Sequence, residues 1–360
     1  MKAYDEKKVI SSPSPPVLYI ELTKNCIARC SFCRGKNWVN KPIFNMSEEN
    51  FNILLNDYIP FATLVDLRGE GESLILPNFD EYVSKVARFK PSIRLTTTLG
   101  CGNQKSLQSL IDHDVFISVS FDAAEKSLYE SIRPGISFDI VVKNIDFLTK
   151  SIIKKHGTLE NRFRLGIVPL QVKNINQIDG IIRFAEKFYI PEIKISPLGS
   201  APGDHNLLKY KKKETAANLR RAVALARKTG IRLRLGRSLF DEFQIKEKMF
   251  DLCCHPWLYI FITNGGEIGF CDHMIDPRLF CSIGDIFQKK EDVWNGEKIQ
   301  RMRVAHLSKD SSILPGSCKR CYNCGRYADH EHELNPQFIR WLVTEDDIEK
   351  KLDQLDQLDT

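Results

Sequence analysis

The chain has 360 residues, 42% of them hydrophobic and 27% charged, which is the composition of an ordinary globular protein with a large core and room for a second module. No apolar run is long enough to cross a bilayer, and residues 1–8 are charged with no apolar stretch behind them, so we expect a cytoplasmic protein without a signal peptide. The formal net charge of +6 is spread thinly, and the basic residues at 209–213 and 232–237 are typical of solvated faces rather than of a nucleic-acid-binding stripe.

The first two thirds of the chain alternate between strand and helix patterns. Residues 1–16 are predicted to form a flexible arm, because they end in a Pro-rich stretch. Strand patterns follow at 17–22, 64–68, 93–98, 115–120, 163–168 and 192–196. Helix patterns lie between and after them at 47–59, 79–89, 104–112, 138–153, 175–188 and 213–229. This alternation predicts an α/β fold, a partial six-stranded (β/α)6 TIM-like barrel over residues 17–237, with its active site at the carboxyl ends of the strands.

Three cysteines lie within eight residues directly after the first strand, namely Cys26, Cys30 and Cys33. Thiolates are the usual ligands of iron–sulfur clusters, and this C-x3-C-x2-C spacing supplies three of them with no fourth cysteine close in sequence. Zinc is the alternative, but a structural zinc site needs four ligands. Disulfides do not suit an intracellular chain with eleven cysteines.

The cysteine triplet resembles the defining motif of the radical S-adenosylmethionine (SAM) superfamily. The resemblance implies a [4Fe–4S] cluster held by Cys26, Cys30 and Cys33, with SAM chelating the fourth iron. It further implies that an electron from a flavodoxin or ferredoxin-type reductant breaks a C–S bond of SAM and releases a 5′-deoxyadenosyl radical. The cofactor then carries the chemistry, and the protein supplies orientation and shielding.

Two further stretches are similar to SAM-binding elements of this superfamily. The first, after the second strand, consists of Gly69, Glu70, Gly71 and Glu72. The resemblance implies that its backbone carbonyls and a carboxylate receive the SAM ammonium group, with glycine allowing close approach.

The other stretch ends the fourth strand and contributes Ser120, Asp122 and Arg133. The resemblance implies that Ser120 and Asp122 meet the ribose or carboxylate of SAM and that Arg133 pairs with its carboxylate, a task that suits a guanidinium. The alternative for Asp122 is an N-cap of the next helix.

A second group of cysteines lies beyond residue 238. Its order of Cys, Trp, hairpin turn and Cys, followed by C-x2-C, resembles the SPASM/twitch extension of radical SAM enzymes over roughly residues 250–325. The resemblance implies a small α+β cysteine-rich domain over 238–334, followed by a helical tail over 335–360. It also implies one auxiliary [4Fe–4S] cluster with the ligands Cys254, Cys271, Cys318 and Cys321. A zinc site on the same thiolates is the alternative.

Four cysteines are left over: Cys101, Cys253, Cys281 and Cys324. Cys253 or Cys324 can replace a neighbour in the auxiliary set, and any of the four is a candidate catalytic residue that returns a hydrogen atom to the substrate. The histidines near this region, among them His255, are expected to be surface groups or partners of the ligands rather than ligands themselves.

The resemblance implies an enzyme, a radical SAM oxidoreductase or maturase that catalyses oxidation, cross-linking or epimerisation. A ribosomal peptide is the first choice of substrate. The runner-up is a secondary alcohol of an aminocyclitol or sugar, which is supported by the expectation that the sixteen residues ahead of Val17 are too few for a precursor-binding domain. A zinc-stabilised binding protein without catalysis is the hypothesis from another class. No membrane is expected as a partner, and nucleic acid is not favoured.

Overall fold

One ten-stranded sheet organises the part of the chain that the computed structural model describes. The described residues are 2–30, 32–33, 45–198, 207–235, 239, 252–271, 282–308, 312–323 and 350–353. The strands in chain order are β1 (Val17–Ile20), β2 (Leu64–Asp66), β3 (Ser92–Thr97), β4 (Phe116–Ser120), β5 (Phe163–Leu170), β6 (Glu192–Pro197), β7 (Arg232–Leu235), β8 (Tyr259–Ile262), β9 (Glu267–Gly269) and β10 (Ser282–Asp285).

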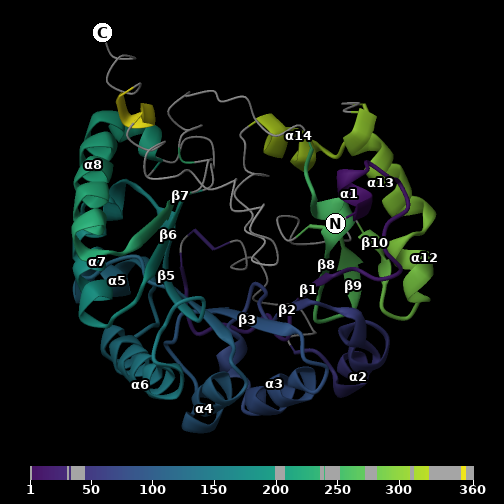
Figure 1. The fold of residues 1–360 in the computed structure, drawn as a ribbon, viewed down its shortest axis with the longest axis horizontal. Coiled ribbons are helices and arrows are strands. Elements are labelled where there is room, and N and C mark those ends of the chain that lie inside the picture. Colours follow the sequence, from purple (N-terminus) through teal and green to yellow (C-terminus); the bar gives the residue numbers. More distant parts are fainter. Residues whose placement is uncertain are drawn as a thin grey trace.

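Most neighbouring strands in this sheet are parallel. The strand order is β10-β9-β8-β1-β2-β3-β4-β5-β6-β7, and the run from β1 to β7 is parallel throughout. β8 also runs parallel to β1, with Tyr259 opposite Val17, while β8, β9 and β10 pair antiparallel. Figure 1 shows the strands as an arc whose ends, at β7 and β10, stay apart.

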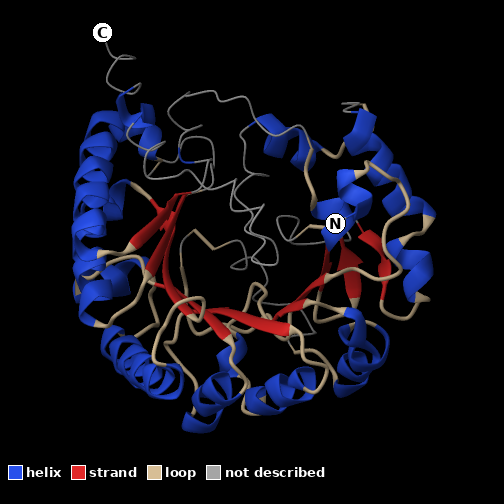
Figure 2. Ribbon diagram, in the orientation of Figure 1, coloured by secondary structure: helices blue, strands red, loops and turns tan. Residues whose placement is uncertain are grey.

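Helices surround the arc of strands on its outer side, as Figure 2 shows. Their bounds are α1 (Lys2–Asp5), α2 (Glu48–Asp57), α3 (Phe79–Ala87), α4 (Gln104–Asp112), α5 (Lys126–Ile132), α6 (Phe138–His156), α7 (Ile178–Lys187), α8 (Lys212–Thr229), α10 (His255–Leu258), α12 (Lys290–Trp294), α13 (Glu297–Ser308) and α14 (Gly316–Asn323). Short 3-10 turns lie at Ile59–Phe61, Ser73–Ile75, Val172–Gln177 and Leu208–Lys211. The apolar face predicted for α6 is buried at Val141, Ile145, Leu148 and Ile152, because it packs onto the sheet.

The predicted fold class is confirmed, since the six predicted strands form β1 to β6 of a parallel sheet surrounded by helices. β7 was not predicted, because its Arg-Leu-Arg-Leu sequence resembles a basic run. Leu233 and Leu235 of β7 are buried, whereas Arg232 and Arg234 form ion pairs with Glu192 of β6. α5 was also not predicted. The predicted domain boundaries after residues 237 and 334 lie outside the described residues.

The N-terminal segment lies against the C-terminal region instead of forming a flexible arm. Tyr4 donates a hydrogen bond to the Leu252 carbonyl, and the indole of Trp257 donates one to the Lys8 carbonyl. The buried Arg303 donates to the carbonyls of Val9 and Pro256. The Pro-rich composition predicted the lack of regular structure at residues 11–16, but it carried no information about these long-range contacts.

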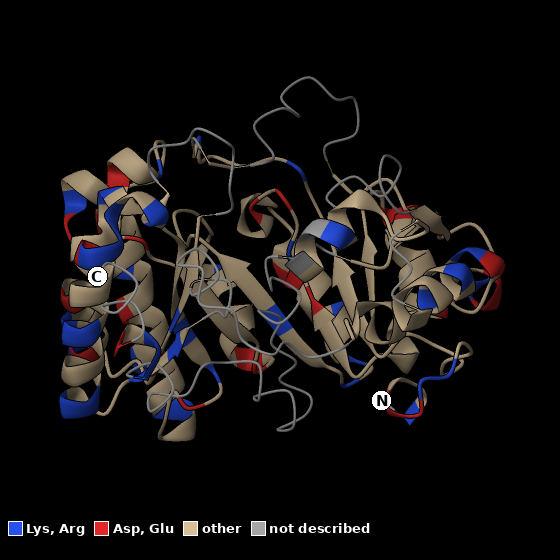
Figure 3. Ribbon diagram, turned by 90° about the horizontal axis from the view of Figure 1, so that it is seen from above, with Lys and Arg blue, Asp and Glu red and all other residues tan. Residues whose placement is uncertain are grey.

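Basic residues lie on the solvent side of α8, as expected for a solvated face. Figure 3 shows Lys and Arg along this helix, at the left of the view. Several of them are paired with acidic residues, for example Arg221 with Asp179 and Arg220 with Asp353. Among the described residues, no helix is both long and apolar enough to span a membrane.

Candidate functional site

The loop that leaves β1 carries the three clustered cysteines at the carboxyl edge of the sheet. Cys30 is buried, and its carbonyl accepts a hydrogen bond of 3.1 Å from the Cys33 amide, which turns the loop back on itself. Burial raises the pKa of the Cys26 thiol to about 11, and the negative charges of Glu72, Cys30 and Cys33 raise it further. The three thiols therefore lie near enough to one another to interact when ionised.

The loop after β2 packs against the start of the cysteine loop. A Cβ atom on Gly71 would lie 2.3 Å from the Thr23 carbonyl oxygen, and one on Gly69 would lie 2.3 Å from Cγ of Glu21. The Glu72 amide donates a hydrogen bond of 2.8 Å to the Asn25 carbonyl. Glycine is thus required at both positions, because only a residue without a side chain lets the two loops approach this closely.

The carboxylate of Glu72 is buried and bound by residues at the end of β3. It accepts hydrogen bonds from the hydroxyl of Thr97 at 2.7 Å, from the amide of Thr98 at 2.7 Å and from the hydroxyl of Thr98 at 2.8 Å. Cys101 follows on the same edge. Burial raises the pKa of its thiol, and the negative charges of Glu72 and Cys26 add to the rise, so Cys101 lies near both.

Asp122 and Arg133 form a buried ion pair beside the cysteine loop. The guanidinium Nε lies 2.6 Å from an Asp122 carboxylate oxygen, and Nη2 donates to the Val168 carbonyl at 3.1 Å. Its Nη1 lies 3.7 Å from the sulfur of Cys30. Burial alone would lower the pKa of Arg133, but the negative charges of Asp122 and Cys30 outweigh it and raise the pKa.

Two expectations for this region can be compared with the structure. Asp122 is not a helix N-cap, because α5 begins at Lys126 and Glu125 precedes it. The contact given for Ser120 is through its backbone: its carbonyl accepts a hydrogen bond from the hydroxyl of Tyr129.

Sequence reasoning missed the contact of the Pro134–Gly135 turn with the cysteine loop, where the Pro134 carbonyl accepts from the Arg29 amide at 2.7 Å. Gly135 has a φ of +93°, and an added Cβ would lie 2.3 Å from the Ile27 carbonyl. The sequence signal for this turn was the glycine at 135 directly after Arg133 and Pro134, since Pro-Gly pairs are typical of turns.

The C-terminal cysteines gather where α10, the β8–β9 hairpin and α14 meet. Burial raises the pKa of Cys253 well above its ordinary value, and the negative charges of Cys254, Cys321 and Cys271 add to the rise. The thiol of Cys253 therefore lies near those of Cys271 and Cys321. Cys318 is buried one helical turn from Cys321, and burial raises its pKa to about 12. Cys281 and Cys324 lie outside the described residues.

Cys254 has apolar surroundings. It is fully buried in a cluster with Trp257, Tyr259, Val17 and other apolar residues. Cys253 lies outside this cluster, and the negative charges of Cys271 and Cys321 contribute to the rise of its thiol pKa.

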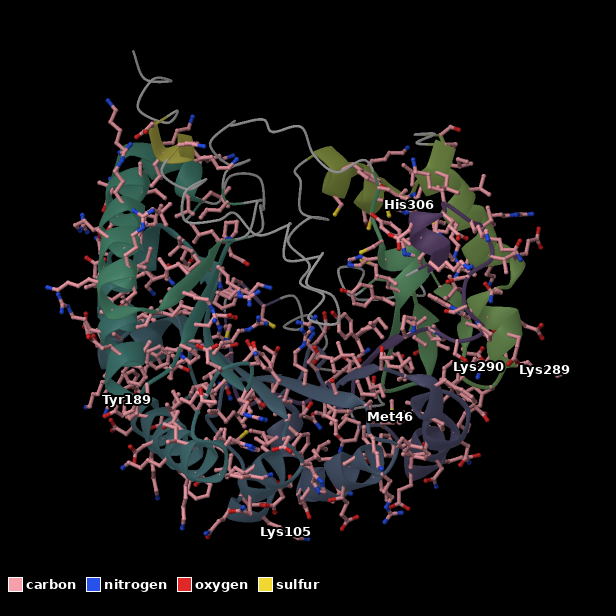
Figure 4. The ribbon with its side chains drawn as sticks, in the orientation of Figure 1. Met46, Lys105, Tyr189, Lys289, Lys290 and His306 are labelled. Carbon is pink, nitrogen blue, oxygen red and sulfur yellow. The ribbon has the colours of Figure 1, made fainter. Side chains whose placement is uncertain are left out.

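Two buried histidines and a tyrosine adjoin these cysteines. The Nδ1 atom of His255 lies 3.1 Å from the sulfur of Cys271. The hydroxyl of Tyr322 accepts a hydrogen bond from the Cys253 amide at 2.9 Å and lies 2.8 Å from Nδ1 of His306. Figure 4 labels His306, which α13 carries near α14. Burial, with the positive charge of His255 as a second cause, lowers the pKa of His306 to about 3, so its ring is neutral.

Within the described ranges, no three His, Cys, Asp or Glu side chains converge as the ligands of one metal ion would. The fit of the cysteines to a cluster rests on their chemistry, because thiolates are the usual ligands of iron–sulfur clusters.

Comparison with known proteins gives a family for one part of the chain and a fold for most of it. Residues 253–322 match the model of the SPASM family, an iron–sulfur cluster-binding domain. No curated protein matches the sequence. Streptococcus suis SuiB bound to S-adenosylmethionine is similar in structure, with a TM-score of 0.63 and 14% identity over 80% of this chain and 67% of that chain.

Two further solved structures share the fold. SuiB bound to the precursor peptide SuiA has a TM-score of 0.62 and 14% identity, over 83% of this chain and 68% of that chain. Native anSMEcpe with bound AdoMet has a TM-score of 0.61 and 15% identity, over 90% of this chain and 98% of that chain. Residues 253–322 thus match an iron–sulfur cluster-binding domain, and most of the chain has the fold of the SuiB and anSMEcpe structures.

Proposed function

We propose that this chain is a radical SAM enzyme that cleaves SAM at a [4Fe–4S] cluster held by Cys26, Cys30 and Cys33. One observation carries the proposal: the loop that holds Cys26, Cys30 and Cys33 follows β1 and packs against the Gly69–Glu72 loop. When bound, the cluster and SAM supply the electron transfer and the 5′-deoxyadenosyl radical that removes a substrate hydrogen.

The residues around the triplet take roles that differ from those the resemblance implies. Nε and Nη2 of Arg133 are engaged by Asp122 and Val168, and Nη1 is directed at Cys30. We therefore assign Arg133 to the Cys30 thiolate, whose charged form a neighbouring cation favours. The Glu72 carboxylate is bound by Thr97 and Thr98, which leaves the backbone of the Gly69–Glu72 loop to receive the SAM ammonium group.

For the auxiliary [4Fe–4S] cluster we propose the ligands Cys253, Cys271, Cys318 and Cys321. Cys253 replaces Cys254 in this set, because its amide donates a hydrogen bond to Tyr322 of α14 and the negative charges of Cys271 and Cys321 act on its thiol. A cluster with four protein ligands has no open iron for SAM. Its use is to accept an electron from the substrate radical, which gives a net oxidation or a cross-link.

A peptide is the substrate that the comparisons favour. SuiB was solved with the precursor peptide SuiA, and anSMEcpe with the Cp18Cys peptide, and both share the fold of this chain. We propose the same class of substrate here, with a flavodoxin or ferredoxin-type protein as reductant. Dehydrogenation of a secondary alcohol of an aminocyclitol or sugar is the alternative.

Anaerobic reconstitution of the full chain with iron and sulfide tests this function. We expect about eight irons per chain, because each of two cubanes holds four, and release of 5′-deoxyadenosine and methionine from SAM on reduction. The control is the variant with Cys26, Cys30 and Cys33 changed to Ala, which should keep about four irons and lose SAM cleavage. A colourless protein that binds two zinc ions would contradict the proposal and favour a zinc-stabilised binding protein.

A further inference from the structure

His255 contacts a proposed ligand of the auxiliary cluster from a buried position. It begins α10, directly after the Cys253–Cys254 pair, and its side chain is 2% exposed. Its Nδ1 atom lies 3.1 Å from the sulfur of Cys271, which is within hydrogen-bonding distance for a sulfur acceptor. The ring packs edge-on against Tyr259, with 4.6 Å between the ring centroids, and this contact fixes the plane of the imidazole.

The direction of this hydrogen bond follows from the chemistry of the ligand. A cysteine that binds iron is a thiolate, which accepts hydrogen bonds and has no proton to donate. A neutral imidazole carries one N–H group. When Cys271 is a ligand, the proton of the contact must therefore be on Nδ1 of His255, and the histidine is the donor.

A donor at this position acts on the electron affinity of the cluster. Hydrogen bonds to the sulfur atoms of a cluster are among the features that set its reduction potential. Reduction adds a negative charge, and an N–H dipole directed at the sulfur stabilises the reduced form more than the oxidised form. Burial strengthens the effect, because the local dielectric constant is low.

We propose that His255 is a positioning residue of the auxiliary cluster: its Nδ1–H group donates to the Cys271 thiolate and raises the reduction potential of the cluster. The proposal rests on the proposed function, since it requires Cys271 to be a ligand. The consequence is that the auxiliary cluster accepts an electron from the substrate radical more readily than the same four thiolates alone would allow.

The structure offers a matched control in His306. This histidine is also buried, at 1% exposed, and is an electrostatic neighbour of His255. Its Nδ1 atom, however, lies 2.8 Å from the hydroxyl of Tyr322. The contact of His306 with the cysteine set is indirect, through Tyr322, whose hydroxyl accepts a hydrogen bond from the Cys253 amide.

The experiment is a potentiometric titration of the reconstituted full chain, followed by electron paramagnetic resonance of the auxiliary cluster. His255→Phe keeps an aromatic ring and removes the donor. We expect it to lower the equilibrium constant for reduction about tenfold, which is about 59 mV for one electron. His255→Asn keeps an N–H near the position of Nδ1 and should recover at least half of that shift. His306→Phe should leave the potential unchanged.

A second readout is taken on the wild-type protein, with His255→Phe as its control. In the wild-type protein labelled with ¹⁵N-histidine, pulsed electron paramagnetic resonance should detect one ¹⁵N nucleus coupled to the reduced auxiliary cluster, and His255→Phe should remove the coupling. Equal potentials in wild type and His255→Phe, or no coupling in wild type, would overturn the inference while iron content and SAM cleavage stay normal. If the reconstituted wild type held too little iron for a second cluster, the proposed function and this inference would both be overturned.

Discussion

Cys253 and Cys254 are adjacent in the sequence, and the structure gives them different surroundings. Cys254 lies in an apolar cluster that connects β1 and β8, whereas the pKa of the Cys253 thiol is raised in part by the negative charges of Cys271 and Cys321. The Cys253 amide is held by Tyr322, which fixes the backbone at this point. The two residues therefore offer a comparison between a proposed ligand and a core residue of the same type.

Substitution of each cysteine separately tests the ligand assignment. Cys253→Ala should lose about four irons per chain, because a cubane needs all of its thiolates. Cys254→Ala should keep both clusters and lower the free energy of unfolding by about 1 kcal/mol, the usual cost of a small change in a core. The measurements are iron content after anaerobic reconstitution and denaturant unfolding. The reverse pattern of iron loss would show that Cys254 is the ligand.

Cys253 and Cys254 also show what could not be predicted from the sequence at the level of single residues. Spacing identified the cysteine groups, since Cys26, Cys30 and Cys33 follow a strand and Cys318 and Cys321 share a helix turn. Spacing does not say which of two neighbouring thiols faces a cluster, because that depends on the backbone angle at one residue. The partners of Glu72 and Arg133 were also beyond the sequence, since Thr97, Thr98 and Val168 come from other strands.

At the scale of elements, the proposed SAM site is made by loops that pack on one another. The cysteine loop contacts the Gly69–Glu72 loop on one side and the Pro134–Gly135 turn on the other. The contacts at Gly71 and Gly135 are with backbone carbonyls, so side chains at these two positions would separate the loops. The geometry of the site depends on these spacings as much as on the cysteines.

Gly71→Ala tests this dependence. The added methyl group would lie 2.3 Å from the Thr23 carbonyl oxygen, so the two loops must move apart. We expect weaker SAM binding, by about tenfold or more, as is usual when a binding group is misplaced by about 1 Å. Gly316→Ala is the control, because nothing lies within 4 Å of its added Cβ. Equal dissociation constants for SAM in wild type and Gly71→Ala, measured by calorimetry, would show that the loop contact does not position SAM.

Elements with a strong local pattern were predicted and those with a weak one were not. The buried face of α6 and the Ser47 cap of α2 follow from local spacing, and both are present. β7 has a period-2 pattern that four residues do not distinguish from a basic run, and α5 is only seven residues long. The joining of β8 to β1 was not predictable from local patterns, because more than two hundred residues separate the strands.

For the whole molecule, Arg303 is the residue that ties distant parts together. Its guanidinium donates to the carbonyls of Pro256, Val9 and Trp294 and to the side chain of Asn295, and it stacks on Trp294. These acceptors come from the N-terminal segment and from α10 and α12. The buried cation thus holds three segments that are far apart in the sequence.

Arg303→Met should lower the free energy of unfolding by about 3 kcal/mol or more, because several buried carbonyls lose their donors at once. Arg301→Met, two residues away on α13, is the control. Arg301 is 77% exposed and pairs with Glu297, so its loss should change stability by about 0.5 kcal/mol or less. Thermal and denaturant unfolding of both variants measure the difference. A similar loss of stability in the two would contradict the role given to Arg303.

The pairing of β8 with β1 has a consequence for biosynthesis. The edge of β1 that pairs with β8 has no partner strand until residues 259–262 have been synthesised. The nascent chain therefore exposes an unpaired strand edge, which promotes aggregation, for most of its translation. A fragment that ends before residue 259 would leave this edge of β1 permanently unpaired.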